Sequence, residues 1–394
     1  MLELFKTSAI RVCQPEPLSG SAWQDVLSRN AYTEARQEIT QWNGYQPTPL
    51  HALPHLSSTL EVGSILYKDE GPRFGLGSFK ALGAAYAAGR LIQRELLNQG
   101  IEAPLDEIRQ GKYADQVRGI TLISATDGNH GRSLAWGASM FGAPCRIYIH
   151  QEVSMRREQA IAKLGAMVTR IDGDYDDSVE LARRDAENNG WFVVSDTSWP
   201  GYTQPPLDVM SGYGVMIDEL STQLKQPPTH LFVQGGVGGL AAGVAAASRQ
   251  QWGDNAPKLV VVEPSLAACL YASASASQMT SVKIDQETLM AGLSCGEPSD
   301  LAWQVLREEG FLFLTIEDEL VAPAMRLLAR PEGNDPPIVA GESAIAGLAA
   351  LVAVSLRDQL RETVGLDAKS RVLLIGSEGA TDPDIYHELV SSRD

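Results

Sequence analysis

Cysteine is scarce in this sequence, with four residues in 394, at positions 13, 145, 269 and 295. No two of them form a C-x-x-C pair, and their spacing is not that of a metal site, which argues against a disulfide scaffold and a cysteine-ligated metal. We therefore expect no bound metal and, most simply, free thiols in a reducing cytoplasm. A bridge between Cys269 and Cys295 stays open as an alternative.

Positive charge is also in short supply, with 32 Lys and Arg against 49 Asp and Glu and a net charge of −17. No basic run is long enough to follow a phosphate backbone, so nucleic acid is not an expected partner. No apolar run reaches the roughly eighteen residues of a membrane span, so no membrane partner is expected either. The first residues, MLELFKTSAIRVCQPEP, lack the long apolar core and cleavage site of a signal peptide, which favours a cytoplasmic location.

The sequence does contain a regular alternation of β-rich and helical runs. The strand candidates are 62–67, 119–124, 145–149, 167–171, 191–194, 230–234, 258–263 and 371–377. The helix candidates are 33–42, 79–98, 132–141, 154–164, 176–189, 212–224, 239–250 and 344–360. Such alternation predicts an α/β fold with mostly parallel sheets flanked by helices. The chain length favours two domains or one large one, and a Pro- and aromatic-rich break, SDTSWPGYTQPP, separates two sets of strands and helices. We expect two domains, a large one from residues 1–83 and 197–394 and a small one from 84–196.

A Gly-rich turn between a strand and a helix leads to Lys80, in the stretch YKDEGPRFGLGSFKALGAA. Ser78 is placed to act as the N-cap of the helix. A lysine in the first helical turn is unfavourable for the helix dipole. Its position therefore indicates a functional role, and the alternative is a solvated surface residue. Phe79 and the small residues after Lys80 predict close packing instead, and partial burial prepares a lysine amine for imine formation.

A second Gly-rich turn lies between the strand candidate 230–234 and the following helix. It consists of Gly235, Gly236, Val237, Gly238 and Gly239. Glycines let the backbone amides wrap an anion, and the helix dipole adds to the attraction, so the turn predicts a phosphate site. It lacks the lysine of a nucleotide-triphosphate loop. A dinucleotide site is the alternative, with Glu263 at the end of the next strand binding a ribose.

The loop SATDGNHG, residues 124–131, ends one strand candidate and begins a helix. Its backbone amides can bind a carboxylate, and Asn129 can hydrogen-bond a phenolic oxygen. Alternatively, Asp127 and Asn129 only cap the helix. A further polar turn ends the last strand candidate, where Ser377 is followed by Glu378.

These four motifs, in their order along the chain, resemble the fold type II pyridoxal-phosphate enzymes, the group that contains the serine and threonine dehydratases. The resemblance extends from Pro47 to Pro383 and implies a homodimer of chains with a large cofactor-binding domain and a small substrate-facing domain. It implies that Lys80 holds pyridoxal 5′-phosphate, that Asn129 contacts its 3′-oxygen and that the glycine turn holds its phosphate. Ser377 would meet the ring nitrogen, with Glu378 as the alternative.

The resemblance also implies a substrate-facing set, within which His130 is structural rather than catalytic. This set is Ser124, Thr126, Asp127, Gly128 and His130. The dehydratases usually have Ser-x-Gly-Asn-His-Gly, whereas this chain has Thr-Asp-Gly-Asn-His-Gly. The extra carboxylate, Asp127, is similar to that of the diaminopropionate ammonia-lyases.

The implied activity is α,β-elimination of a small amino acid, 2,3-diaminopropionate in both D and L forms, to pyruvate and ammonia. Lys80 and Asp127 would act as the two bases, one on each face of the substrate. A serine or threonine dehydratase is the alternative within the class. A dinucleotide-dependent oxidoreductase built on the glycine turn and Glu263 is the alternative from another class, and it would leave Lys80 without a role.

Overall fold

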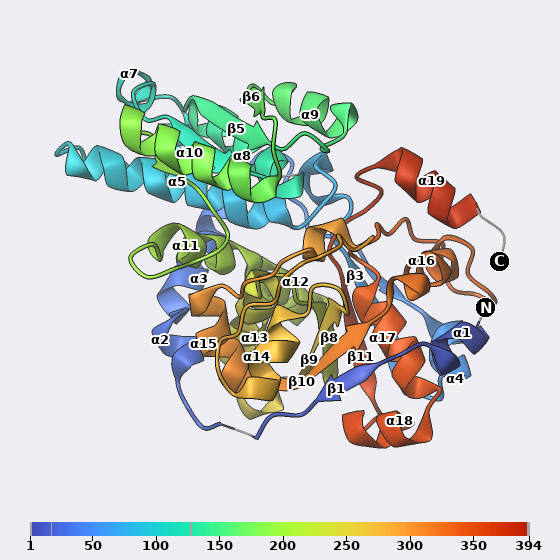
Figure 1. Cartoon of the computed structure of the whole chain (residues 1–394). Helices are drawn as coiled ribbons and strands as arrows, with labels where there is room; N and C mark the ends of the chain where they lie inside the picture. Colours follow the sequence, from blue (N-terminus) through green and yellow to red (C-terminus); the bar gives the residue numbers. More distant parts are fainter. Residues whose placement is uncertain (1, 17, 127, 392–394) are drawn as a thin grey trace. The chain divides into compact units, whose positions relative to one another are not determined.

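The structure, a computed structural model, describes residues 2–16, 18–126 and 128–391 (Figure 1). Its internal contacts divide the chain into two compact units. The first unit consists of Met1–Arg29, Pro47–Ser78 and Met216–Asp394, and the second of Asn30–Gln46 and Phe79–Val215. Each unit has its own sheet, as the alternation of strands and helices predicts.

The first unit contains a seven-stranded sheet with the order β1-β10-β9-β8-β11-β3-β2. Its strands are β1 (Arg11–Cys13), β2 (Leu50–Ala52), β3 (Ser64–Asp69), β8 (His230–Gln234), β9 (Lys258–Pro264), β10 (Gly310–Ile316) and β11 (Arg371–Gly376). The five inner strands are parallel, and the short edge strands β1 and β2 pair antiparallel. The carboxyl ends of β3, β8 and β11 therefore lie at one edge of the sheet, which is where open α/β sheets bind ligands.

Helices cover both faces of this sheet, because parallel strands are connected by crossovers (Figure 1). The α-helices are α1 (Leu2–Thr7), α2 (Ala22–Asp25), α4 (Pro54–Thr59), α12 (Val215–Gln223), α13 (Gly239–Trp252), α14 (Cys269–Ala276), α15 (Asp300–Glu309), α16 (Val321–Ala329), α17 (Ala346–Ser355), α18 (Asp358–Val364) and α19 (Pro383–Ser391). The short 3₁₀ turns are η1 (Arg73–Gly75), η2 (Gly253–Asn255), η3 (Ala291–Leu293) and η4 (Asp318–Leu320).

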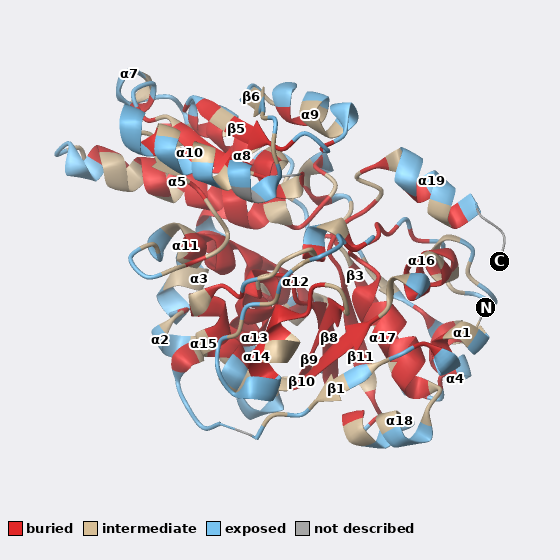
Figure 2. Cartoon of the chain, in the orientation of Figure 1, coloured by how far each residue is buried: buried red, intermediate tan, exposed pale blue. Residues whose placement is uncertain are grey.

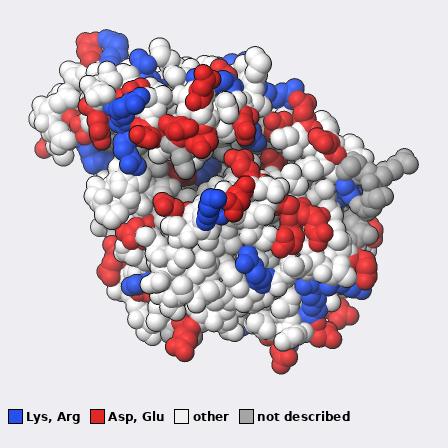
Figure 3. All heavy atoms as spheres, viewed as in Figure 1, with Lys and Arg blue, Asp and Glu red and all other residues white. Residues whose placement is uncertain are grey.

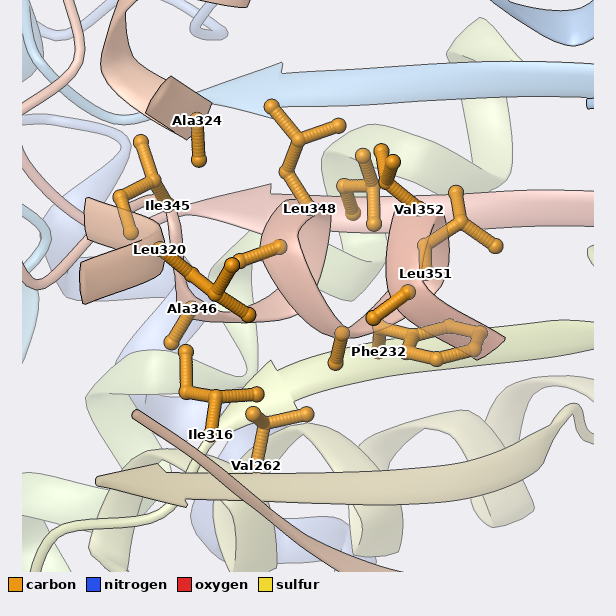
Figure 4. Packing of buried hydrophobic residues seen from close by; sticks show 14 of the residues in the cluster. Phe232, Val262, Ile316, Leu320, Ala324, Ile345, Ala346, Leu348, Leu351 and Val352 are labelled. Atoms are coloured by element: carbon orange, nitrogen blue, oxygen red, sulfur yellow. The ribbon is translucent and has the colours of Figure 1, made fainter. Parts of the chain in front are cut away.

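The core of the first unit is centred on α17, which is apolar on every side and buried along its whole length. Leu348, Leu351 and Val352 of this helix belong to one buried cluster with Phe232 of β8 (Figure 4). Figure 2 shows the inner strands and α17 in the colour of buried residues. The strands read as unbroken apolar runs, such as LVVV in β9, because both of their faces are covered.

The second unit contains a four-stranded parallel sheet with the order β6-β5-β4-β7. Its strands are β4 (Leu122–Ala125), β5 (Cys145–Ile149), β6 (Met167–Arg170) and β7 (Phe192–Val193). Its helices are α3 (Arg29–Ile39), α5 (Lys80–Asn98), α6 (Leu105–Arg109), α7 (Ala114–Val117), α8 (Asn129–Phe141), α9 (Met155–Ala162), α10 (Tyr175–Asn189) and α11 (Gln204–Tyr213).

Several boundaries differ from those expected. The predicted helix 212–224 is two helices, α11 and α12, with Gly214 between them, and the predicted helix 344–360 is divided into α17 and α18. The strand β10 was not predicted at all. The units also have other bounds than the predicted domains: residues 30–46, 79–83 and 197–215 group with the smaller sheet. For the last two segments the reason is that α5 is one continuous helix and packs along α11.

Charged side chains are distributed widely over the described residues. On the face shown in Figure 3, Lys and Arg lie singly or in small groups among Asp and Glu. Within the described ranges, no helix combines the length and the apolar character that crossing a membrane requires. All four cysteines are free thiols in the structure.

Candidate active site

Lys80 is the first residue of α5 in the second unit. The N-cap is Phe79, not the predicted Ser78, which instead forms a β-bridge with Glu378 inside the first unit. The helix behind Lys80 is closely packed: a Cβ built on Gly83 would lie 2.5 Å from the Tyr213 ring. Only glycine fits there, so the small residues after Lys80 serve packing, as the sequence predicts.

The amine of Lys80 forms an ion pair with the carboxylate of Asp196, a residue that the sequence analysis missed. The Nδ1 atom of His130 lies 3.7 Å from the same carboxylate. Burial opposes the ionised form of Asp196, but the nearby charges of Lys80 and His130 outweigh it, so the pKa of Asp196 lies well below its usual value. The second unit therefore presents an amine and an ionised carboxylate side by side.

The position of Asp196 is set by the turn that follows β7. The hydroxyl of Tyr202 donates to the carbonyl of Val193 and accepts from the amide of Ser195, both at 2.9 Å. The ring of Trp199 stacks on Tyr202, with centroids 4.1 Å apart. This aromatic segment, part of the Pro- and aromatic-rich break in the sequence, thus anchors the chain next to Asp196. A carboxylate just beyond a strand of an α/β sheet was the signal that could have identified it.

The loop after β4 carries the predicted substrate-facing residues. Ser124 and Thr126 are buried, and the hydroxyl of Thr126 accepts from the amide of Gly128 at 3.3 Å. His130 is buried, and its Nε2 atom lies 2.9 Å from the carbonyl of Val194. His130 thereby ties the start of α8 to the strand end before Asp196, which is a positioning contact. Asn129 begins α8.

Asp127, the predicted second base, lies outside the described residues. The second unit brings together Lys80, Asp196 and His130 from three separate segments.

The glycine turn lies in the first unit, between β8 and α13. Gly236 and Gly238 have φ angles of 58° and 98°, in the left-handed region that favours glycine. The amide of Gly238 donates to Gly235, but those of Gly236 and Val237 have no acceptor among the described residues. Together with the N-terminus of α13 they present backbone amides that suit an anion, and the phosphate role of the turn stays a prediction.

Glu263 does not fit the dinucleotide alternative. Its side chain is completely buried at the end of β9, and its two oxygens accept from the amides of Leu270 and Tyr271 at 2.9 and 2.7 Å. Burial raises the pKa of Glu263 to about 8, and the two amides act in the opposite direction. A carboxylate that caps a buried helix start is not available to bind a ribose.

Two further segments border the glycine turn. A Cβ built on Gly236 would lie 3.7 Å from the carbonyl of Gly292 and 3.9 Å from the sulfur of Cys295. The amide of Gly292 donates to the hydroxyl of Ser343 at 3.1 Å. The segments 290–294 and 340–343 resemble segments that border the cofactor in the fold type II enzymes, and this role stays a prediction.

Ser377 comes directly after β11, and Glu378 follows it. The Ser377 hydroxyl has no hydrogen-bond partner among the described residues, whereas a carboxylate oxygen of Glu378 accepts from the amide of Ser343 at 3.2 Å. Because β8 and β11 are neighbours, Ser377 and the glycine turn share one edge of the sheet. Gln234 reinforces this edge by donating to the carbonyl of Ile375 at 2.7 Å.

These residues fit pyridoxal phosphate. The first unit offers unpartnered amides for a phosphate and an unpartnered hydroxyl for a ring nitrogen, and the second offers an amine for an aldehyde. The fold and site define a class of enzymes, and residues 42–378 match the family described as pyridoxal-phosphate dependent enzymes. The chain belongs to this family, which confirms the predicted class and cofactor, and it is a lyase of the fold type II group.

Within the family, the chain is similar to diaminopropionate ammonia-lyase. It is 40% identical to the enzyme of Escherichia coli strain K12 over 371 residues, which cover 93% of this chain and 92% of that one. A crystal structure of the Escherichia coli enzyme in complex with an aminoacrylate-PLP azomethine reaction intermediate has a TM-score of 0.87 and 36% identity, covering 98% and 97% of the two chains. Another, in complex with D-serine, has the same TM-score and identity and covers 97% of both.

Proposed function

We propose that this enzyme eliminates ammonia from 2,3-diaminopropionate, in both D and L forms, and so yields pyruvate and a second ammonia. The observation that carries the proposal is the ionised, partly buried Asp196 beside Lys80. The substrate of a dehydratase loses a hydroxyl group and has no second ammonium. Diaminopropionate has a second ammonium, and a partly buried carboxylate is its natural partner.

The bound cofactor draws electrons from the α-carbon of the substrate and so weakens its C–H bond. Lys80 would hold the cofactor through its amine. The same amine, when it is not bonded to the cofactor, would take the α-proton of the L form from the one face that it can reach.

The ionised carboxylate of Asp196 would pair with the β-ammonium of the substrate, as it pairs with the Lys80 amine in the structure. Asp196 keeps this nitrogen protonated until the C–N bond breaks, and the nitrogen leaves as neutral ammonia. His130, 3.7 Å away, helps to hold the carboxylate in place.

Asp127 is proposed as the second base, which removes the α-proton of the D form from the opposite face. In support, the similar Escherichia coli enzyme forms a crystalline complex with D-serine, an amino acid of that configuration. The remaining contacts are proposed by residue as follows. Asn129 binds the 3′-oxygen of the cofactor, Gly235–Gly239 its phosphate and Ser377 its ring nitrogen, while Ser124, Thr126, Gly128 and His130 shape the substrate loop.

We further propose that the seven-stranded unit is the cofactor-binding domain and the other the substrate-facing domain. We also propose that two copies of the chain form a homodimer in the cytoplasm. The resemblance to the fold type II enzymes supports the dimer, and the four free thiols are consistent with a reducing compartment.

The test is to incubate the purified chain with pyridoxal phosphate and to measure pyruvate and ammonia from D- and L-diaminopropionate, serine and threonine. The wild type should turn yellow, and borohydride should bleach the colour and label the peptide that contains Lys80. Lys80→Ala should be inactive, whereas Lys112→Ala, which changes an exposed lysine of the same unit, should be unaffected. Faster turnover of serine or threonine than of diaminopropionate would favour a dehydratase, and a label on another lysine would refute the role of Lys80.

A further inference from the structure

A cluster of buried charged side chains lies in the first unit and includes Arg73, in the turn that leads to Lys80. We call it the buried charge cluster, and it consists of Lys68, Glu70, Arg73 and Glu219, together with Thr48. Each of these side chains is at most 3% exposed. Lys68 comes from β3, Arg73 from the turn η1 and Glu219 from α12. Glu70 directly follows β3, and Thr48 comes from the segment before β2.

Arg73 is the centre of the cluster. Its guanidinium donates to both oxygens of Glu70, each at 2.8 Å, and to both oxygens of Glu219, at 2.7 and 3.0 Å. Lys68 donates to the same Glu219 at 2.6 Å and to the carbonyl of Thr48 at 2.9 Å. Burial opposes the ionised form of Glu219, but Arg73 and Lys68 outweigh it, so the pKa of Glu219 lies below its usual value. The cluster is therefore charged and internally balanced.

The turn that follows Arg73 has a strained backbone. Phe74 has φ 51°, in the left-handed region that a bulky side chain rarely adopts, and Gly75 and Gly77 have φ 71° and 87°. A conformation of this kind persists only where the surrounding contacts impose it. The bidentate contacts of Arg73, the residue next to Phe74, are such contacts.

The strained turn is joined to the turn that carries Ser377. The amide of Glu70 donates to the carbonyl of Gly376 at 2.8 Å, and that of Gly379 donates to Gly77 at 3.0 Å. Ser78 forms a β-bridge with Glu378. The segment 70–78 thus runs beside the Ser377 turn and ends two residues before Lys80 in the chain.

Stability alone does not explain such a cluster, because well-packed apolar residues of the same size would commonly serve as well or better. What a balanced buried cluster provides is one specific arrangement of the segments that it joins. We propose that Arg73 is a positioning residue, which holds segment 70–78 through Glu70 and Glu219 and thereby fixes both the chain that leads to Lys80 and its pairing with the Ser377 turn. The expected effect of Arg73 on cofactor capture by Lys80 rests on the proposed function, whereas its effect on the conformation of segment 70–78 does not.

Arg73→Lys tests the proposal, since it keeps the charge and removes the planar, bidentate contacts. Arg361→Lys is the matched control. Arg361 donates to the carbonyls of Leu60 and Glu61 at 2.7 and 2.6 Å, and Glu61 also has φ 51°, but this turn precedes β3 and does not lead to Lys80. Thermal unfolding and circular dichroism would first be used to check that both variants are folded. If Arg73→Lys does not fold, Glu219→Gln removes one carboxylate of the same cluster and takes its place.

The first measurement is amide hydrogen exchange of the cofactor-free full chain. Exchange in residues 70–78 should rise about ten-fold or more in Arg73→Lys and stay at the wild-type rate in Arg361→Lys. Unchanged exchange in Arg73→Lys, or an equal rise in the control, would overturn the proposal whether or not the chain binds pyridoxal phosphate.

The second measurement is the rate at which the cofactor-free chain captures added pyridoxal phosphate on Lys80, followed by its colour. Arg73→Lys should be slower by about ten- to a hundred-fold, the scale of a small misplacement of a reacting group, and Arg361→Lys should match the wild type. Wild-type capture by a folded Arg73→Lys would refute the positioning role. Absence of capture by the wild type would instead refute the proposed function, so the two failures are distinguishable.

Discussion

Replacement of Asp196 by asparagine tests the ion pair with Lys80 directly. The substitution keeps the shape of the side chain and removes the negative charge that stabilises the protonated amine. Only an unprotonated amine attacks an aldehyde. We therefore expect Asp196→Asn to capture pyridoxal phosphate at lower pH than the wild type, and yet to eliminate ammonia from diaminopropionate more slowly, because the β-ammonium has lost its partner.

The size of the shift follows from the geometry. Two unit charges about 4 Å apart attract each other by about 4 kcal/mol at an effective dielectric constant of about 20. The side chains of Lys80 and Asp196 are 22% and 21% exposed, so solvent screening reduces this to about 1.5–3 kcal/mol. At about 1.4 kcal/mol per pH unit, the midpoint of capture should move by about 1–2 units toward acid.

The assay is the rate of colour formation after pyridoxal phosphate is added to cofactor-free protein over a series of pH values. Asp185→Asn is the control, since Asp185 accepts from Tyr148 at 2.5 Å in the same unit and does not contact Lys80. The kcat for diaminopropionate should fall about ten- to a hundred-fold in Asp196→Asn and stay unchanged in the control. Identical pH profiles for the wild type and Asp196→Asn would refute the reasoning.

Three other outcomes are expected. Ser377→Ala should still bind the cofactor but lose about 1–3 kcal/mol of transition-state stabilisation, seen as a roughly ten- to hundred-fold lower kcat, and wild-type turnover would transfer the role to Glu378. Asp127→Asn should lower kcat/KM for the D form at least about ten-fold more than for the L form, and equal losses would make Asp127 a binding group rather than a base. Burial lowers the pKa of His230 from 6.5 to about 4, so the unfolded chain binds more protons between these values and stability falls by up to about 3 kcal/mol as the pH drops through them. His230→Gln should lose this acid sensitivity of thermal unfolding while the exposed His55→Gln keeps it, and equal sensitivity in His230→Gln would assign the effect to another group.

Local patterns in the sequence were sufficient for much of this protein. Strands such as β5 and β8 were predicted to the residue, because apolar runs bounded by turn residues depend on neighbours in the chain. The glycine turn was found for the same reason, since positive φ angles at Gly236 and Gly238 are a property of the backbone at those positions.

The tertiary structure decided which distant residues meet. Asp196 reaches Lys80 across more than a hundred residues of chain, and no local pattern encodes such a contact. The same holds for Arg73 and Glu219, which lie 146 positions apart in the chain. Contact between distant residues also explains the error at Ser78. Serine is a common N-cap residue, but pairing with Glu378 holds the backbone of Ser78 outside the helix. The helix propensity of a residue is a local preference worth a few tenths of a kcal/mol, or about 1 kcal/mol for an N-cap. Buried charge pairs and sheet contacts between distant residues are collectively stronger, so they prevail where the two conflict.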